Sequence, residues 1–79
     1  MVLVRYFAAA RAAAGVAEEK IAADSLGSVV AAVTELHGER LARVLTACSF
    51  LVDGTAAHDL TTPLDQGVTV DVLPPFAGG

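Results

Sequence analysis

Cysteine is nearly absent from this chain. Cys48 is the only one among 79 residues, so an intramolecular disulfide is impossible, which fits a reducing compartment. No histidine or basic residue lies near it in the sequence to lower its pKa, so we expect a buried, inert thiol. His37 and His58 have no consistent ligand spacing, and the sequence therefore predicts no metal site.

Basic residues are also scarce. Five stand against nine acidic ones, for a net charge of -4, and they are scattered along the chain: Arg5, Arg11, Lys20, Arg40 and Arg43. A nucleic acid partner would need a basic stripe that releases counterions, and the overall field of this chain would repel a polyanion. We therefore expect no nucleic acid partner.

Long uncharged runs are missing as well. The longest, Ser25 to Thr34, has ten residues, which is about half of what a membrane-spanning helix needs. We expect no membrane partner. The chain opens directly on a strand-like segment, without a basic leader or a separate apolar segment, so the sequence predicts a cytoplasmic location.

The length and composition predict a single domain, 1–79. A second core in so short a chain could not bury its share of surface. Val, Leu, Ile and Phe number 24 of the 79 residues, which is enough for a packed core. Sixteen residues are Ala, which bury little area each, so this core should be modest.

The first half of the chain predicts two strands and two helices. Val2 to Phe7 is β-rich and apolar on both faces apart from its arginine, as in a strand inside a sheet, and we expect Phe7 in the core. A short helix, Ala8 to Ala14, ends at Gly15. A second strand covers about Ala17 to Ala22; Glu19 has no evident role there, because it shares a face with apolar Ile21.

The main helix begins after Ser25, whose side chain can cap it. Apolar residues then recur every three or four positions, giving one buried stripe of Leu26, Val29, Val30, Val33 and Leu36. Gly38 lies just past its end, and Glu39 to Ala47 forms a shorter helical piece.

The second half predicts strands. Cys48 to Val52 leads into Asp53-Gly54, a strong hairpin signal, and Thr55 to His58 can return as a weak partner strand. A turn-rich stretch follows. The alternation of Val68 to Val72 then predicts a half-buried final strand. The order predicts an α+β domain in which one main helix packs on one sheet, with a more polar outer face.

The chain ends in eight uncharged residues, Val72 to Gly79, of which the last two are glycines. At average glycine usage such an ending arises by accident about 0.5% of the time, so chance is a poor explanation. Pro74-Pro75 stops the strand, because neither nitrogen can donate to the ladder, and favours an extended path away from the sheet. We expect residues 74–79 to form a flexible, projecting tail with a reach of up to about 20 Å.

The C-terminal carboxylate is the candidate working group. Gly78 and Gly79 lack a β-carbon, so they can pass a narrow channel and present that carboxylate unhindered. A carboxylate is a poor electrophile and needs activation, most simply as a mixed anhydride with a nucleotide phosphate. The chain has no phosphate-binding glycine loop and no base beside the tail, so a partner must activate it.

The tail alone should not hold a partner. Fixing Phe76 to Gly79 costs roughly 4 to 8 kcal/mol of backbone entropy, whereas burying Phe76 returns only about 1.5 to 3 kcal/mol. We therefore expect the exposed sheet face beside the tail to contribute an apolar contact, with Phe76 as an anchor. Arg11 is a further candidate contact, although a solvated residue of the short helix is the plainer interpretation.

These segments resemble the MoaD-like and ThiS-like sulfur carriers of the β-grasp, ubiquitin-like fold, and most closely the small subunit of molybdopterin synthase. Arg5-Tyr6-Phe7-Ala8, with Arg11 and Gly15, is similar to the family's opening strand and helix. Pro63-Leu64, Gly67 and Val70 are similar to its closing strand. The ending Pro74-Pro75-Phe76-Ala77-Gly78-Gly79 is the specific part of the resemblance, which spans nearly the whole chain.

The resemblance implies a mixed sheet of four to five strands on one main helix. It implies that an E1-like enzyme adenylates Gly79 with ATP, and that a sulfur donor such as a sulfurtransferase converts it to a thiocarboxylate. The large subunit of molybdopterin synthase would then bind Pro74, Pro75, Phe76, Ala77 and Gly78 and supply the catalytic side chains for molybdenum cofactor synthesis. The chain itself would bind no cofactor and would not be an enzyme.

Other functions stay open. A carrier could serve thiamine, cysteine or another thio-metabolite, although Pro74-Pro75 favours molybdopterin. A ubiquitin-like modifier would join Gly79 to lysines of target proteins. A plain binding module would not need Gly79 at all.

Overall fold

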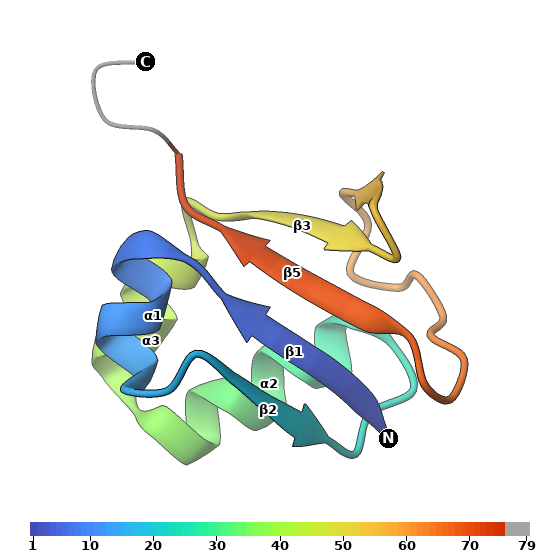
Figure 1. Cartoon of the computed structure of the whole chain (residues 1–79), viewed down its shortest axis with the longest axis horizontal. Coiled ribbons are helices and arrows are strands. Elements are labelled where there is room, and N and C mark those ends of the chain that lie inside the picture. Colours follow the sequence, from blue (N-terminus) through green and yellow to red (C-terminus); the bar gives the residue numbers. More distant parts are fainter. Residues whose placement is uncertain (76–79) are drawn as a thin grey trace.

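The fold is a five-strand sheet, in the order β2-β1-β5-β3-β4, with helices on one side (Figure 1). The computed structural model describes residues 1–75. β1 pairs with β5 in parallel, and the other neighbouring pairs are antiparallel. Along the chain the elements are β1 (Val2–Tyr6), α1 (Ala8–Ala14), β2 (Glu18–Ile21), α2 (Leu26–His37), α3 (Glu39–Leu45), β3 (Ser49–Val52), β4 (Thr55–Ala57) and β5 (Thr69–Leu73).

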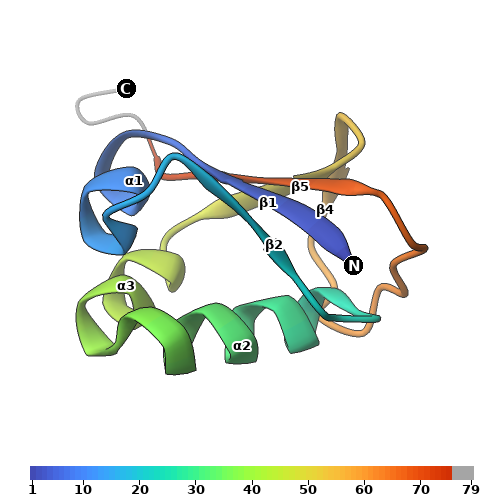
Figure 2. The ribbon, with the colours of Figure 1, turned by 60° about the horizontal axis from the view of Figure 1, so that its bottom comes forward.

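The core lies between the sheet and α2. Figure 2 shows α2 below the sheet, with α1 and α3 at one end of it. Alternate residues of the central strands point inward and are almost fully buried, as strand geometry requires. The predicted two-layer α+β arrangement is thus confirmed. The most deeply buried side chains are Val2, Val4, Leu26, Val29, Val33, Leu41, Val70 and Val72.

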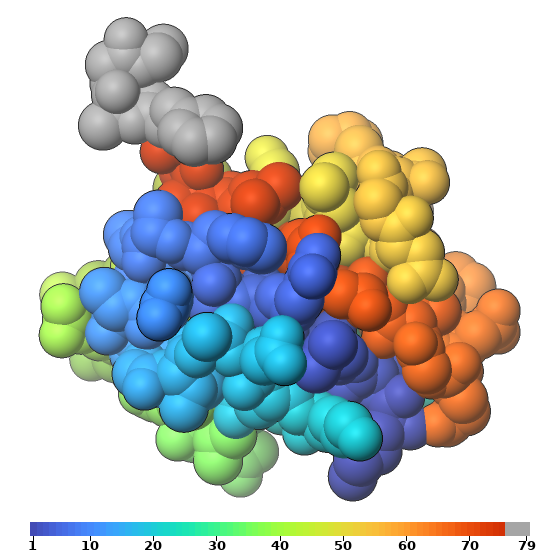
Figure 3. Space-filling view, viewed as in Figure 1, coloured from blue at the N-terminus to red at the C-terminus, as the bar shows by residue number. Residues whose placement is uncertain are grey.

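The opposite side of the sheet carries the other alternate residues, and we call it the outer face. Figure 3 looks onto it as an unbroken surface running from β2 across to β3. Strand register fixes its members, because paired residues point to the same side. They are Leu3, Arg5, Glu18, Lys20, Ser49, Leu51, Ala56, Thr69, Asp71 and Leu73.

The predicted elements all form, with small shifts at their ends. Ser25 caps α2, since its Oγ accepts a hydrogen bond of 3.1 Å from the Ser28 backbone N–H. Gly15 ends α1 at φ 79°, in the left-handed region. No helix within residues 1–75 is long and apolar enough to cross a membrane.

The prediction that Leu36 belongs to the buried apolar stripe is wrong. Leu36 is 60% exposed. The buried positions of α2 are Leu26, Val29 and Val33, and steps of three or four residues lead next to His37, which bonds to Glu19 of β2. At this end of α2 the inward position is thus taken by His37, and Leu36, one residue before it, is left exposed.

Glu19, which the pattern left without a role, lies at the rim of the core. Its side chain faces inward, on the same side of the strand as Ile21, as its position predicts. Its Oε2 accepts a hydrogen bond of 2.6 Å from the Tyr6 hydroxyl. His37 Nε2 bonds to the same oxygen, and the Tyr6 and His37 rings meet edge to face at 5.9 Å. Burial, and then the bond to Glu19, raise the pKa of Tyr6 well above its ordinary range.

We predict that Tyr6→Phe lowers the free energy of unfolding by about 1 to 3 kcal/mol, because Glu19 loses a buried donor while ring packing is kept. Urea unfolding followed by circular dichroism measures this. In a Glu19→Ala background the same substitution should cost much less. An equal cost in both backgrounds would show that the hydroxyl does not act through Glu19.

Candidate functional site at the end of the last strand

β5 holds the chain firmly up to the residue before the two prolines. Its last residue, Leu73, pairs with Ser49 of β3, and the Phe7 backbone N–H donates a hydrogen bond of 3.2 Å to the Val72 carbonyl. The strand ends at Leu73. The prediction that Pro74-Pro75 stops it is therefore confirmed, since neither proline can donate to a neighbouring strand.

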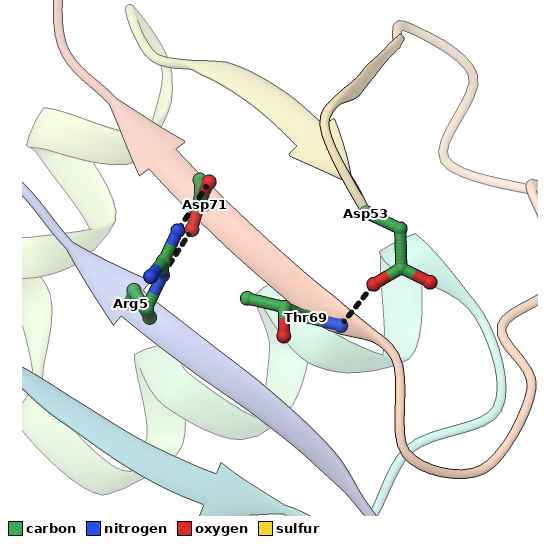
Figure 4. A network of polar contacts seen from close by, with 4 residues as sticks. All are labelled: Arg5, Asp53, Thr69 and Asp71. Carbon is green, nitrogen blue, oxygen red and sulfur yellow. Dashed lines mark hydrogen bonds and ion pairs between the residues drawn. The ribbon is translucent and has the colours of Figure 1, made fainter.

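An ion pair on the outer face joins the two parallel central strands. Arg5 Nε and Nη2 donate hydrogen bonds of 2.7 and 3.0 Å to the two carboxylate oxygens of Asp71 (Figure 4). The hydrogen bond and the charge of Asp71 raise the pKa of Arg5 above its ordinary value. Asp71 is only 8% exposed. Such a carboxylate is costly without a partner, and Arg5 supplies one with matched two-point geometry.

A second polar contact holds the start of β5. Asp53 Oδ1 accepts a hydrogen bond of 2.8 Å from the Thr69 backbone N–H, and the Asp53 backbone N–H donates 2.8 Å to the Thr69 carbonyl (Figure 4). Asp53 and Gly54 have φ of 47° and 83°. Two consecutive positive φ values match the tight hairpin that Asp53-Gly54 predicts. The hairpin thus also fixes the final strand.

The prediction that Phe7 lies in the core is wrong. Phe7 is 39% exposed. Val2, Val4 and Tyr6 face the core, and Phe7 continues this alternation in an extended conformation, so its side chain lies on the same side as Arg5, whose guanidinium sits 5.8 Å from its ring centroid. This contact is within the range of a cation–π interaction. A large aromatic side chain therefore lies beside the end of β5.

Arg11, the candidate partner contact, lies near the same place. It is exposed on α1 and lines a shallow cavity of about 260 Å³ together with Arg5, Phe7 and Glu18. The fold therefore brings together two arginines and one aromatic ring from residues that are close in sequence. Contact of Arg11 with a partner stays a prediction.

Of the remaining predicted site residues, the structure describes only those up to Pro75. Pro74 and Pro75 follow β5 directly, and Pro75 is exposed. Phe76, Ala77, Gly78 and Gly79 lie outside the described residues. The anchoring role of Phe76 and the chemistry at Gly79 are therefore considered below as proposals.

Cys48 is half-buried at the start of β3. Its Sγ–H donates to the Val44 carbonyl at 3.2 Å, and burial raises the pKa of the thiol. A raised pKa reduces the thiolate fraction, and the thiolate is the nucleophilic form. Within residues 1–75, no three His, Cys, Asp or Glu side chains are grouped as metal ligands would be.

We predict that folded Cys48 reacts with iodoacetamide more slowly than the same thiol in urea-unfolded protein at about pH 8, near the ordinary pKa of a free cysteine. The rate should also rise at higher pH than in the unfolded chain, because the thiolate forms later. Intact mass over a time course measures both rates. Equal rates, or faster reaction of the folded chain, would make Cys48 an activated thiol.

Comparisons of the sequence and of the structure with known proteins show which family the chain belongs to. The sequence matches the ThiS family over residues 4–79. A search of curated protein sequences finds no match. Among solved structures, small archaeal modifier protein 1 from Methanosarcina acetivorans superposes with a TM-score of 0.87 at 24% identity, covering 99% of this chain and 95% of that one.

Two other solved structures share the fold. Subunits 1 and 2 of the molybdopterin-converting factor from Helicobacter pylori form a protein–protein complex, and one chain of that structure matches with a TM-score of 0.75 at 28% identity, covering 99% of this chain and 97% of that one. CysO from Mycobacterium tuberculosis matches with a TM-score of 0.81 at 18% identity, covering 96% and 100%. The fold is the predicted β-grasp, and the chain belongs to the ThiS family of ubiquitin-like sulfur carriers.

Proposed function

We propose that the chain carries sulfur as a thiocarboxylate on Gly79 and serves as the small subunit of molybdopterin synthase. The observation that supports this most directly is the way the last strand ends. β5 is fixed between two strands up to Leu73, Pro74-Pro75 stops it, and Gly78-Gly79 follow soon after, a pair that the family match includes.

The proposed cycle needs two chemical steps at Gly79. First, an E1-like enzyme joins the carboxylate to the α-phosphate of ATP, releasing pyrophosphate and leaving a mixed anhydride. Second, a sulfur donor such as a sulfurtransferase persulfide attacks the carbonyl carbon, and AMP leaves. A thiol then attacks the sulfurtransferase sulfur of the resulting acyl disulfide, which frees the thiocarboxylate and leaves a disulfide between the thiol and the sulfurtransferase. The chain contributes the unhindered acyl group, and the partners contribute the catalysis.

The outer face is the proposed docking surface for those partners. Leu51 and Leu73 are partly exposed there, and Phe7 lies at its border. Burying one aromatic or leucine side chain contributes about 1.5 to 3 kcal/mol, so two or three of them offset the roughly 4 to 8 kcal/mol of tail entropy. The Arg5–Asp71 pair can be covered at reduced cost, because each charge already has its partner.

A larger synthase subunit is the proposed final partner. The solved complex of subunits 1 and 2 of the molybdopterin-converting factor is a precedent for such a pairing in a protein that is 28% identical to this chain. Pro74-Pro75 favours the same assignment over a thiamine or cysteine pathway. In this proposal the chain is a non-catalytic subunit. Arg11 lies at the border of its interface with the larger subunit, and Phe76 is the first tail residue that the larger subunit buries.

A second candidate function is a ubiquitin-like modifier that is joined to target lysines through Gly79. It is favoured by the likeness in fold to small archaeal modifier protein 1, whose name describes such a role. Both functions begin with the same adenylation. They differ in whether sulfur or an amine then attacks the activated carbonyl.

The proposal is tested by incubating the purified chain with its activating enzyme, ATP and a sulfurtransferase with its sulfur source. The intact mass should rise by the difference between one sulfur and one oxygen atom, because a thiocarboxylate replaces the carboxylate. Fragmentation should place the change at Gly79.

A chain lacking Gly79 is the matched control and should show no gain. A second control chain from the same pathway must be converted in parallel. Failure of the full-length chain under conditions that convert this control would contradict the proposal.

The docking role of the outer face is tested by Phe7→Ala, measured as the Kd for the activating enzyme or the large subunit by calorimetry. Loss of a partly exposed ring should weaken binding by about 1.5 kcal/mol, or about tenfold in Kd. Leu36→Ala removes an exposed apolar side chain from α2 on the other side of the sheet and should leave Kd within about twofold. Equal effects of the two substitutions would exclude the outer face as the contact.

A further inference from the structure

Lys20 is the only lysine in the chain. The other basic side chains are Arg5, Arg11, Arg40 and Arg43, and a guanidinium remains protonated and does not act as an acyl acceptor at physiological pH. The N-terminal amine of Met1 is hydrogen-bonded to Gln66. Lys20 is therefore the one side-chain amine that an activated carbonyl could acylate.

The position of Lys20 makes it accessible from outside the molecule. It lies on β2, which is the outermost strand on one side of the described sheet (Figure 1). Its side chain is exposed, and the strand register assigns it to the outer face. One backbone edge of β2 consequently has no neighbouring strand among the described elements. Such an edge can pair with an extended segment of another chain.

Lys20 lines a shallow cavity. It has a volume of about 340 Å³ and is lined by Met1, Val2, Leu3, Lys20, Gly67 and Thr69. The lining is mostly apolar, and apart from Lys20 it offers no charged side chain. A narrow, uncharged stretch of polypeptide with small side chains fits this chemistry, and residues 77–79 of a second copy have that composition.

We propose that Lys20 is the acceptor for the activated Gly79 of a second copy of this chain. This inference rests on the proposed adenylation of Gly79. The unprotonated Nζ attacks the Gly79 carbonyl carbon, a C–N bond forms, and the bond from that carbon to the phosphate oxygen breaks. AMP leaves with the electron pair, and the amine proton passes to solvent. The product is an isopeptide bond.

The sheet geometry favours an acceptor on another copy, because a tail that reached its own Lys20 would have to use most of its length of about 20 Å lying back across the sheet. Lys20 is paired with Leu3, and Leu3 with Thr69, so Lys20 lies level with the start of β5, whereas the tail leaves from Leu73 at its other end. To acylate its own Lys20, a tail would have to turn back along about 13 Å of sheet and cross two strands of about 4.8 Å each. Each copy then offers one donor and one acceptor, so the products are unbranched chains with one kind of linkage.

The test uses the full-length chain with its activating enzyme and ATP, without a sulfur source, followed by denaturing gel electrophoresis and intact mass. We expect a ladder whose first rung has twice the mass of one copy less one water. Peptide mapping should join the Gly79 carbonyl to Lys20 Nζ. Lys20→Arg keeps the charge and should abolish the ladder. The thiocarboxylate yield of the same variant with a sulfur source shows whether the activating enzyme still binds and adenylates it.

Four results would overturn the inference. A ladder that persists in Lys20→Arg would assign the acceptor to the N-terminus. A monomer that has lost one water would show acylation within one copy. Conversion to the thiocarboxylate when sulfur is supplied, with no ladder when it is not, would show that Gly79 is activated but Lys20 does not accept it. Absence of both reactions would overturn the proposed function and this inference together.

Discussion

The parallel pairing of β1 with β5 is the constraint on which the rest of the molecule depends. If the working group is the chain's own end, the last strand must not slip, because each residue of slip would move the start of the tail by about 3.3 Å and turn every side chain to the other face. Val70 and Val72 hold the register from the core, and Asp71 holds it from the outer face through Arg5. Asp53 fixes the first residue of the same strand. A one-residue slip would bury Asp71 without Arg5 and expose the two valines, so three independent contacts specify one register.

The Arg5–Asp71 pair has a second effect, on Phe7. The Arg5 end of the pair is half exposed, so water screens part of the attraction, whereas Asp71 is buried and needs its partner. The pair's two-point geometry also orients the Arg5 guanidinium, which lies over the Phe7 ring. The ring in turn belongs to a residue whose backbone N–H is bonded to Val72. An aromatic side chain that is ordered before binding loses less entropy on docking, so in the proposed function this pair would serve recognition as well as the register of β5.

The sequence predicts the fold well because most of the elements are local patterns. Helix caps such as Ser25 and Gly15, the Asp53-Gly54 turn and the alternation in β5 depend on neighbours in the chain, and all were placed to within a residue or two. The errors concern residues whose surroundings depend on tertiary contacts. In the sequence Glu19 has no evident role, because its partners Tyr6 and His37 belong to other elements and are brought to its carboxylate only by the fold. Phe7 was predicted in the core from its hydrophobicity, whereas the alternation of β1 puts its side chain on the outer side together with Leu3 and Arg5.

The division between tail and domain also bears on how related carriers are told apart. Gly78-Gly79 offers a partner only backbone and a carboxylate, so it can confer reactivity but little identity. The entropy of fixing four tail residues exceeds what Phe76 alone returns, so specific binding has to draw on side chains of the folded domain. On this chain those nearest the end of β5 are Arg5, Phe7, Arg11 and Leu73, which combine charge with apolar area. Selection among sulfur pathways should therefore depend on this part of the domain, while the tail confers the chemistry common to all of them.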